Sequence, residues 1–155
     1  MNNFWVSAEL QLSASALLFD GLGRLLVLKP TYKSGWTLPG GMSEYGETPW
    51  GACRREVAEE TGLTLLAGKL VCVDTRPERH GGALGLRYLF RGEVLSDDEV
   101  DRVRVQQGEI SDFRFVTRSD ALSMLRAPVA RRAQIGWDAE HCVYLEDGHR
   151  VPGVC

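Results

Sequence analysis

The feature that most constrains this chain is a helix whose two ends are both marked in the sequence. Thr48 followed by Pro49 predicts its start, because the threonine hydroxyl caps free N–H groups and proline is tolerated at the first helical position. Gly62 is suited to a left-handed C-terminal cap, so we expect the helix to end at Thr61. The rest of the chain must fold around this helix.

One face of the predicted helix carries three carboxylates. Glu56, Glu59 and Glu60 are spaced i, i+3 and i+4, which places them on the same side. Like charges at this spacing destabilise a helix, so we expect a cation to bind them. Oxygen ligands without histidine or cysteine favour a hard divalent cation, and Mg²⁺ or Mn²⁺ is therefore the predicted cofactor.

The neighbouring stripe of the helix is expected to pack against a sheet and not to bind the cation. Trp50, Cys53 and Val57 are spaced i, i+3 and i+7, the pattern of a helix that rests on a sheet. Arg55 precedes the carboxylates, and we expect it to pair with Glu47 in the preceding loop. This pair would hold loop and helix together, which is a structural role.

The same segment resembles the signature of the Nudix hydrolase family. That signature is Gly, five residues, Glu, seven residues, Arg-Glu, an aliphatic residue, any residue, Glu-Glu, any residue, Gly and an aliphatic residue. Every position is filled, by Gly41, Glu47, Arg55, Glu56, Val57, Glu59, Glu60, Gly62 and Leu63. Average residue frequencies give a chance match somewhere in the chain a probability on the order of 10⁻⁸ to 10⁻⁷. The resemblance is therefore specific.

The resemblance implies a fold, an activity and a ligand set. The fold is the Nudix α/β/α sandwich, and the activity is metal-dependent hydrolysis of a nucleoside diphosphate linked to another moiety X, such as a nucleoside triphosphate, ADP-ribose or a nucleotide sugar. Glu56, Glu59, Glu60 and the carbonyl of Gly40 would bind the metal. The expected partner is a small-molecule nucleotide derivative. Members of the family often dimerise, so a homodimer is an open alternative.

The resemblance does not fix which carboxylate is the general base, because members of the family differ. Some use a glutamate of the helix, which here favours Glu56 or Glu60. Others use a glutamate of a later loop, which Glu109 resembles because it precedes an aromatic strand. We place the helix glutamates first and Glu109 second.

Five further side chains each have two interpretations. Tyr32 and Trp36 either stack on a nucleobase or belong to the core or its rim. Glu44 either joins the metal site or is solvated. Arg76 and Arg79 either contact a phosphate of the substrate or belong to a solvated basic loop.

Outside the helix, the sequence predicts mainly strands. Asp20-Gly21 indicates a turn that closes a hairpin, and Pro39 before two glycines indicates a tight bend. Strands are expected at residues 12–19, 24–28, 63–73, 84–90, 113–116 and 142–145, short helices at 119–125 (capped by Ser119) and 128–135, and polar connections at 74–82 and 93–107. The predicted fold class is α+β, a mixed β-sheet flanked by helices.

Length and composition exclude several classes of protein. With 155 residues we expect a single domain over residues 1–155, and 44% hydrophobic with 25% charged residues excludes disorder. The sequence shows neither a membrane span nor a signal peptide, so we expect a cytoplasmic protein without a membrane partner. The four cysteines lie far apart, which predicts reduced thiols without a zinc site.

The net charge of −3 falls entirely within residues 44–60. That segment holds five acidic and two basic residues, whereas the rest of the chain holds 16 of each sign. We therefore expect that the protein does not bind long nucleic acid. We expect one concentrated cation site, which a phosphorylated substrate approaches only with metal bound. The alternative function is a noncatalytic nucleotide-binding sensor or interaction module on the same fold.

Overall fold

A mixed six-stranded sheet forms the centre of the molecule in the computed structural model, which describes residues 9–77 and 82–154. The strands are β1 (Leu10–Leu17), β2 (Leu25–Pro30), β3 (Gly40–Met42), β4 (Gly68–Arg76), β5 (Leu84–Gly92), β6 (Ile110–Val116), β7 (Val143–Glu146) and β8 (His149–Arg150). The helices are α1 (Pro49–Thr61), α2 (Asp97–Arg102), α3 (Arg118–Met124) and α4 (Ala127–Trp137).

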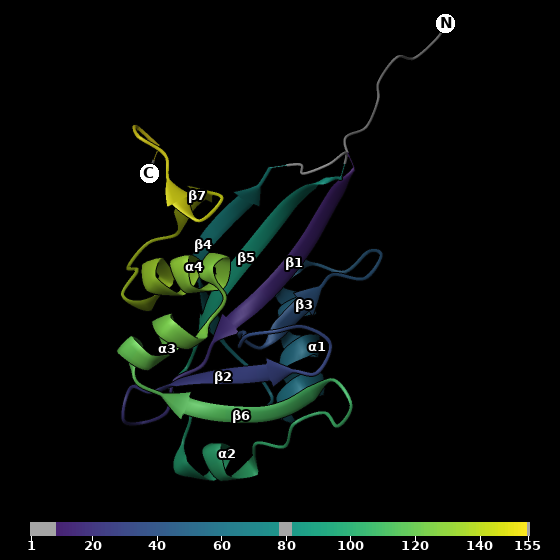
Figure 1. The fold of residues 1–155 in the computed structure, drawn as a ribbon, viewed down its shortest axis with the longest axis vertical. Coiled ribbons are helices and arrows are strands. Elements are labelled where there is room, and N and C mark those ends of the chain that lie inside the picture. The colour runs from purple at the N-terminus through teal and green to yellow at the C-terminus, as the bar shows by residue number, and fades with distance from the viewer. Residues whose placement is uncertain (1–8, 78–81, 155) are drawn as a thin grey trace, which may run out of the picture.

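The strand order of the central sheet is β3-β1-β5-β4-β7-β8. The pairs β1–β5 and β4–β7 are parallel, and the other pairs are antiparallel. Helix α1 lies on one side of this sheet and α3 and α4 on the other (Figure 1). Strands β2 and β6 form a separate antiparallel pair. The predicted α+β fold, a mixed sheet between helices, is confirmed.

Two apolar clusters lie on opposite faces of the central sheet. Side chains alternate along β1, so Ala14 and Ala16 pack with Cys53 and Val57 of α1, whereas Leu17 joins the cluster under α4. Strand β2 contributes side chains to both clusters and is therefore buried on both faces. The layer structure follows from this alternation.

Helix α1 forms as the sequence predicts. The side chain of Thr48 accepts a hydrogen bond from the N–H of Gly51 at 3.0 Å, and Gly62 ends the helix with a φ of +74°. Cys53 and Val57 are fully buried, which confirms the expected packing stripe. Both ends and the rotation of the helix are therefore set locally.

The predicted hairpin between the first two strands is confirmed only at its turn. The turn is closed by a bridge between Phe19 and Leu25 and by hydrogen bonds of Asp20 with Arg24. Beyond it the strands separate: β1 pairs with β3 and β5, and β2 pairs with β6. Strand β2 lies between the two apolar clusters, with side chains in both, and it does not continue the hairpin by pairing along β1.

The strand predicted at residues 63–73 begins later, at Gly68. Leu63 and Leu65 alternate as in a strand and are buried, but they pack at the end of α1. The Nε of Arg54 donates to the carbonyl of Leu65 at 2.9 Å, which holds this segment against the helix. Strand pairing starts only where Gly68 lies opposite Gly92.

The predicted polar connection at 93–107 contains helix α2. Ser96 and Glu99 form a capping box, in which the Ser96 hydroxyl accepts from the Glu99 N–H and the Glu99 carboxylate accepts from the Ser96 N–H. Leu95 and Val103 on either side are buried, so the segment is anchored at both ends. The cap predicted at Ser119 for the next helix is also wrong: Thr117 caps α3.

Three of the four cysteines lie within the described residues. Cys53, Cys72 and Cys142 are free thiols, and Cys155 lies outside the described residues. Burial raises the pKa of Cys53 and of Cys72 to about 12, so both remain protonated. Among the helices within residues 9–77 and 82–154, none has the length and apolar character needed to cross a membrane.

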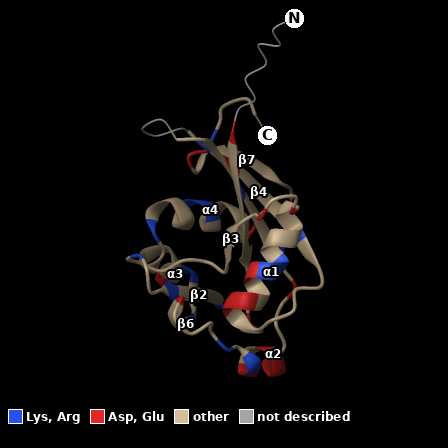
Figure 2. Ribbon diagram, turned by 90° about the vertical axis from the view of Figure 1, so that its right-hand side faces the viewer, with Lys and Arg blue, Asp and Glu red and all other residues tan. Residues whose placement is uncertain are grey.

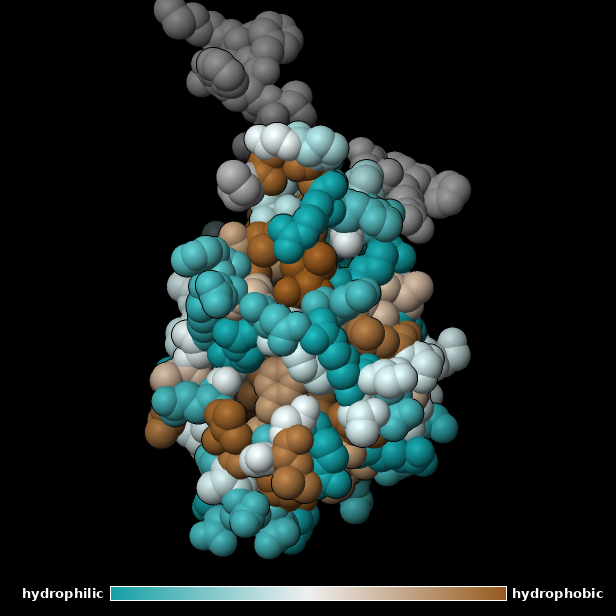
Figure 3. Space-filling model, turned by 90° about the vertical axis from the view of Figure 1, so that its left-hand side faces the viewer, coloured by the Kyte–Doolittle hydropathy of each residue, from teal (hydrophilic) through white to brown (hydrophobic). Residues whose placement is uncertain are grey.

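One face of the molecule is shown as a space-filling view in Figure 3. On this face the hydrophobic residues form separate patches between hydrophilic side chains. The homodimer remains a prediction.

Helix α4 approaches the sheet closely at Gly136, which provides a test of the packing. A Cβ at this position would lie 2.9 Å from side-chain carbons of Leu89 and Val71. Gly136→Ala should therefore destabilise the fold by about 1–3 kcal/mol through overpacking, although alanine favours a free helix. Denaturant unfolding measures this, and Gln134→Ala on the exposed side of α4 should stay within about 0.5 kcal/mol of wild type. Equal stability of Gly136→Ala and wild type would contradict the close packing.

Candidate functional site

The acidic face of α1 is only partly open to solvent. Packing of Cys53 and Val57 against the sheet fixes the rotation of the helix. As a result Glu60 is only 5% exposed, and the side chain of Glu56 is 16% exposed. The side chain of Glu59 is half exposed. Two of the three carboxylates therefore point inward and the third points toward solvent.

Arg55 joins the helix to the loop before it. Its Nε and Nη2 donate to the two carboxylate oxygens of Glu47 at 2.9 and 3.1 Å. Its Nη1 donates to Glu56 at 2.8 Å and to Glu59 at 3.2 Å, and its Nη2 also donates to the carbonyl of Met42 at 3.0 Å. The predicted pair with Glu47 is confirmed, and Arg55 is in addition the counter-charge of two helix glutamates.

The doubled glycine brings strand β3 against the acidic face of α1. The N–H of Gly40 donates to Oε2 of Glu60 at 2.8 Å. A Cβ at Gly40, whose φ is +147°, would lie 2.5 Å from the Cα of Ser15, and a Cβ at Gly41 would lie 2.5 Å from Oε1 of Glu56. The expected bend lies at Pro39, and the two glycines that follow are strand residues that permit a close approach.

Glu60 is a buried carboxylate in an acidic setting. Burial raises the pKa of Glu60 to about 7, and the charges of Glu56 and Glu109 act in the same direction, against the hydrogen bond from Gly40. A bound cation would favour the ionised form of Glu60. Carboxylate oxygens beside a backbone strand are also the donors that a hard divalent cation prefers, so the residues present fit Mg²⁺ or Mn²⁺.

The three helix glutamates do not converge on a single point. In the parts of the chain that the structure describes, no three Asp, Glu, His or Cys side chains are grouped as ligands of one ion. The reason is Arg55, which holds Glu56 and Glu59, while Glu60 is turned toward Gly40. Metal binding by this set remains a prediction.

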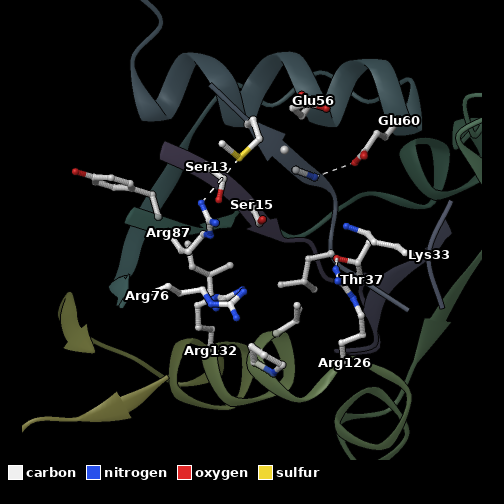
Figure 4. Close-up of a pocket in the computed structure, with 18 of the residues that line it drawn as sticks. Ser13, Ser15, Lys33, Thr37, Glu56, Glu60, Arg76, Arg87, Arg126 and Arg132 are labelled. Carbon is white, nitrogen blue, oxygen red and sulfur yellow. Dashed lines mark hydrogen bonds between the residues drawn. The ribbon is translucent and has the colours of Figure 1, made fainter. Parts of the chain in front are cut away.

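A cavity of about 540 Å³ opens beside Glu56 and Glu60 (Figure 4). Ser13 and Ser15 of β1 line it from the sheet, and Glu109 is a third carboxylate on its wall. Five cationic residues line the same cavity, namely Lys33, Arg76, Arg87, Arg126 and Arg132. Figure 2 shows the acidic residues of α1 in red and the basic residues of α4 in blue. One side of the cavity therefore offers carboxylate ligands for a cation, and the other side offers positively charged hydrogen-bond donors for an anion.

Glu109 reaches the cavity from the loop that precedes β6. Its backbone carbonyl accepts from the N–H of Thr31 at 2.8 Å, which ties this loop to the end of β2. The structure thus brings together Glu56, Glu60 and Glu109, the three candidate bases. Which of them acts remains a prediction.

The other predicted residues are divided between the cavity and its surroundings. Tyr32 and Arg76 line the cavity. Trp36 is not among the lining residues: it packs against the apolar cluster under α4, and the guanidinium of Arg114 lies 4.9 Å from its ring centroid. The carboxylate of Glu44 is exposed, 3.9 Å from Arg55, and also lies outside the lining. The prediction for Arg79 falls outside the described residues.

Sequence reasoning missed most of the cationic side of the cavity. A signal existed for Arg87, which stands two residues before the apolar Leu89 on a predicted strand and so shares its face. Ser13 likewise shares a face with the buried Leu17. Arg126, before the predicted helix at 128–135, and Arg132, within it, carried no comparable signal.

The contacts of Arg55 can be tested by a substitution that keeps the charge. Arg55→Lys cannot bridge Glu47, Glu56 and the carbonyl of Met42 at the same time, because an ammonium lacks the planar fork of a guanidinium. We expect a loss of about 1–3 kcal/mol in the free energy of unfolding, measured with denaturant in EDTA. The neighbouring Arg54→Lys, an exposed residue, should lose less than about 1 kcal/mol. Equal losses in the two variants would contradict the role of Arg55.

Comparison with known families identifies the relatives of this site. A family model described as the NUDIX domain matches residues 9–135, a span that includes α1, the cavity strands and Glu109. A MutT-like protein from Streptomyces ambofaciens is 43% identical over 72 residues, which are 46% of this chain and 47% of that protein. The chain spans less than half the length of the curated relatives that it matches.

Solved structures agree with this result. The MutT protein from Methanosarcina mazei Go1 superposes with a TM-score of 0.64 and 25% identity, over 79% of this chain and 88% of that one. The NUDIX domain of Shewanella oneidensis NrtR complexed with ADP ribose has a TM-score of 0.64 and 20% identity, over 83% and 86% of the two chains. The second likeness shows the fold alone.

Proposed function

Because the chain belongs to the Nudix family, we propose that it hydrolyses the diphosphate linkage of a nucleoside diphosphate joined to another moiety X. The observation that carries this proposal is one cavity onto which Glu56, Glu60 and Glu109 all face, beside a complete family signature at residues 41–63. Phosphoryl transfer is catalysed mainly by positioning and by electrostatic stabilisation. A cavity with carboxylates on one side and cations on the other is suited to both.

Mg²⁺ or Mn²⁺ is the proposed cofactor. Glu56, Glu59, Glu60 and the carbonyl oxygen of Gly40 would hold it. A divalent cation bound there would neutralise phosphate oxygens and polarise the phosphorus that is attacked. The buried position of Glu60 supports this assignment, since an ionised carboxylate in that place needs a counter-charge.

Carboxylates of the chain would take the proton of the attacking water. Glu56 and Glu60 are the first candidates, because both face the cavity and the N–H of Gly40 fixes the orientation of Glu60. Glu109 is the second candidate, on the opposite loop. Arg55 is a positioning residue in this scheme, since it holds Glu47 and the loop that leads into α1.

The proposed substrates are nucleoside triphosphates, ADP-ribose and nucleotide sugars. ADP ribose is the ligand in the complex of the Shewanella NUDIX domain. Tyr32 lines the cavity and is largely exposed, so its ring is available to stack on a nucleobase. Arg76 would contact a phosphate. Trp36 is left out of this scheme because it packs elsewhere.

Carboxylate-to-amide variants test the proposed activity. Glu60→Gln can still accept from the Gly40 N–H, so its fold should persist while turnover with Mg²⁺ falls by at least about 10²-fold. The assay is a panel of nucleoside triphosphates, ADP-ribose, dinucleotides and nucleotide sugars. Glu93→Gln, an exposed residue after β5, is the control and should retain activity. Full activity of both Glu59→Gln and Glu60→Gln would rule out the proposed metal site.

Removal of the metal is a separate test. EDTA should abolish turnover, and excess Mg²⁺ should restore it. Because a ligand that binds only the folded state stabilises it, Mg²⁺ should also raise the Tm of the wild type and raise that of Glu60→Gln less. Turnover that persists in EDTA, together with an unchanged Tm, would contradict the proposed cofactor.

The second candidate function is a noncatalytic nucleotide-binding module. The contacts of Arg55 favour it, because they balance the charges of Glu56 and Glu59 without a metal ion. The complete family signature favours hydrolysis. Calorimetry with the same panel separates the two functions: tight binding of a nucleotide that stays intact in saturating Mg²⁺ would identify the module.

A further inference from the structure

Three arginines gather at one side of the cavity, away from the helix glutamates. Arg87 comes from β5, Arg76 from the end of β4, and Arg132 from α4, which packs over the same face of the sheet. In Figure 4 these three side chains lie together, whereas Glu60 lies across the cavity from them. Of the three, only Arg76 was named as a candidate from the sequence.

Strand pairing places Arg87 at the centre of this group. Arg87 lies opposite Ser13 on β1 and opposite Asp74 on β4, and Arg76 lies opposite Gly85. Residues paired in this way project from the same face of a sheet. A Cβ at Gly85 would lie 3.2 Å from Nη2 of Arg87 and 3.4 Å from the Cβ of Arg76. The missing side chain at Gly85 therefore leaves room for the guanidinium over the sheet.

The positive charge of the group is only partly compensated. Asp74 is fully buried and accepts from Nη1 of Arg132 at 3.0 Å. Within residues 9–77 and 82–154, the carboxylate paired with Arg76 is that of Asp147, at 3.9 Å. Among the described residues no ion pair involves Arg87, whose Nη1 donates to the carbonyl of Gln11 at 3.4 Å.

The gathering of like charges has a cost that a bound anion would remove. Burial lowers the pKa of Arg87, and the charges of Arg132 and Arg76 lower it further, while Asp74 acts in the opposite direction. A partly buried cluster of guanidinium groups is a strong site for phosphate, because each can donate two parallel hydrogen bonds.

We propose that Arg76, Arg87 and Arg132 bind a terminal phosphate of the substrate that is remote from the diphosphate to be hydrolysed. That the bound molecule is a substrate rests on the proposed function. Binding of an anion by these arginines does not depend on it. The substrates so defined are nucleotides that carry a phosphate monoester in addition to the scissile diphosphate. Arg87 is then a specificity-determining residue.

Sheet geometry separates this site from the metal side of the cavity. Gly40, which holds Glu60, pairs with Ser15 on β1, whereas Arg87 pairs with Ser13 on the other edge of β1. Two strand spacings and two residues along the strand put the Cα atoms of Gly40 and Arg87 about 12 Å apart. This backbone spacing supports two sites on one cavity that take two separate anionic groups.

Binding of inorganic phosphate to the metal-free protein is the first test. In EDTA at low salt, calorimetry should show that Arg87→Gln weakens phosphate binding by about tenfold or more. Gly85→Ala keeps every charge but displaces the guanidinium, so it should weaken binding several-fold and serves if Arg87→Gln does not fold. Lys69→Gln removes an exposed charge from the same strand as Arg76 and should leave the affinity within about twofold. Equal affinities of wild type and Arg87→Gln would overturn the proposal.

Substrate pairs that differ by one phosphate are the second test. The pairs are ADP-ribose 2′-phosphate with ADP-ribose, and coenzyme A with dephospho-coenzyme A. In at least one pair the wild type should show a kcat/KM about tenfold or more higher for the phosphorylated member, and Arg87→Gln should bring this ratio close to one. A ratio near one in both pairs for the wild type overturns the proposal, and so does an equal loss for both members in Arg87→Gln.

The two tests distinguish failure of this proposal from failure of the proposed function. Arginine-dependent phosphate binding without turnover of any nucleotide in the panel would reject hydrolysis and keep the anion site. Turnover that requires Glu60 but is indifferent to Arg87 would keep hydrolysis and reject the anion site. Each outcome therefore addresses one claim.

Discussion

The contact between strand β3 and helix α1 is the constraint on which the rest of the site depends. Strand β3 pairs with β1 on one edge only, so its other edge would leave backbone groups without partners. Side chains of α1 replace the missing strand: Glu60 accepts from the N–H of Gly40, and Arg55 donates to the carbonyl of Met42. The carboxylate of Glu60 and the guanidinium of Arg55 are thus held by the same hydrogen bonds that complete the edge of the sheet.

This contact also explains why the chain carries glycine at two successive positions. Any Cβ at Gly40 or Gly41 would meet backbone atoms of β1 or the carboxylate of Glu56. Without the close approach, the glutamates of α1 would stand above the edge of the sheet and would not face the cavity. The alternation of β1 then does two things at once, since Ala14 packs under α1 while Ser13, on the other face, leaves space for a ligand.

How far the sequence predicts this structure depends on the range of the interactions involved. Helix α1, its caps and the pair of Arg55 with Glu47 are local, and they were predicted correctly. The capping box that starts α2 is also local, at Ser96 and Glu99, and it was overlooked. The partners of β1 and β2 are set by burial between two clusters formed from distant segments, so the local turn at Asp20 suggested a hairpin that does not continue.

The candidate site shows the same division between local and distant interactions. Glu56 and Glu60 lie one turn apart and could be assigned together, and Glu109 was found only by resemblance. The cations around the cavity come from the loop after β2, from β4 and β5, and from the segment around α4, so no spacing in the sequence connects them. A contact that depends on the pairing register of two strands, such as that of Arg76 with Gly85, has no signal before the sheet is known.

The distribution of charge changes the order of events expected at the site. A balance of 16 acidic and 16 basic residues outside residues 44–60 suggested that only bound metal would attract a phosphorylated ligand. The folded chain places five cationic residues and three glutamates around one cavity, so the formal charge of its lining is positive. Because a ligand responds to the field of the cavity and not to the sum over the chain, attraction does not have to wait for the metal. Under the proposed function, the metal would be needed at the carboxylates for hydrolysis, whereas the ligand would be captured from the opposite side of the same cavity.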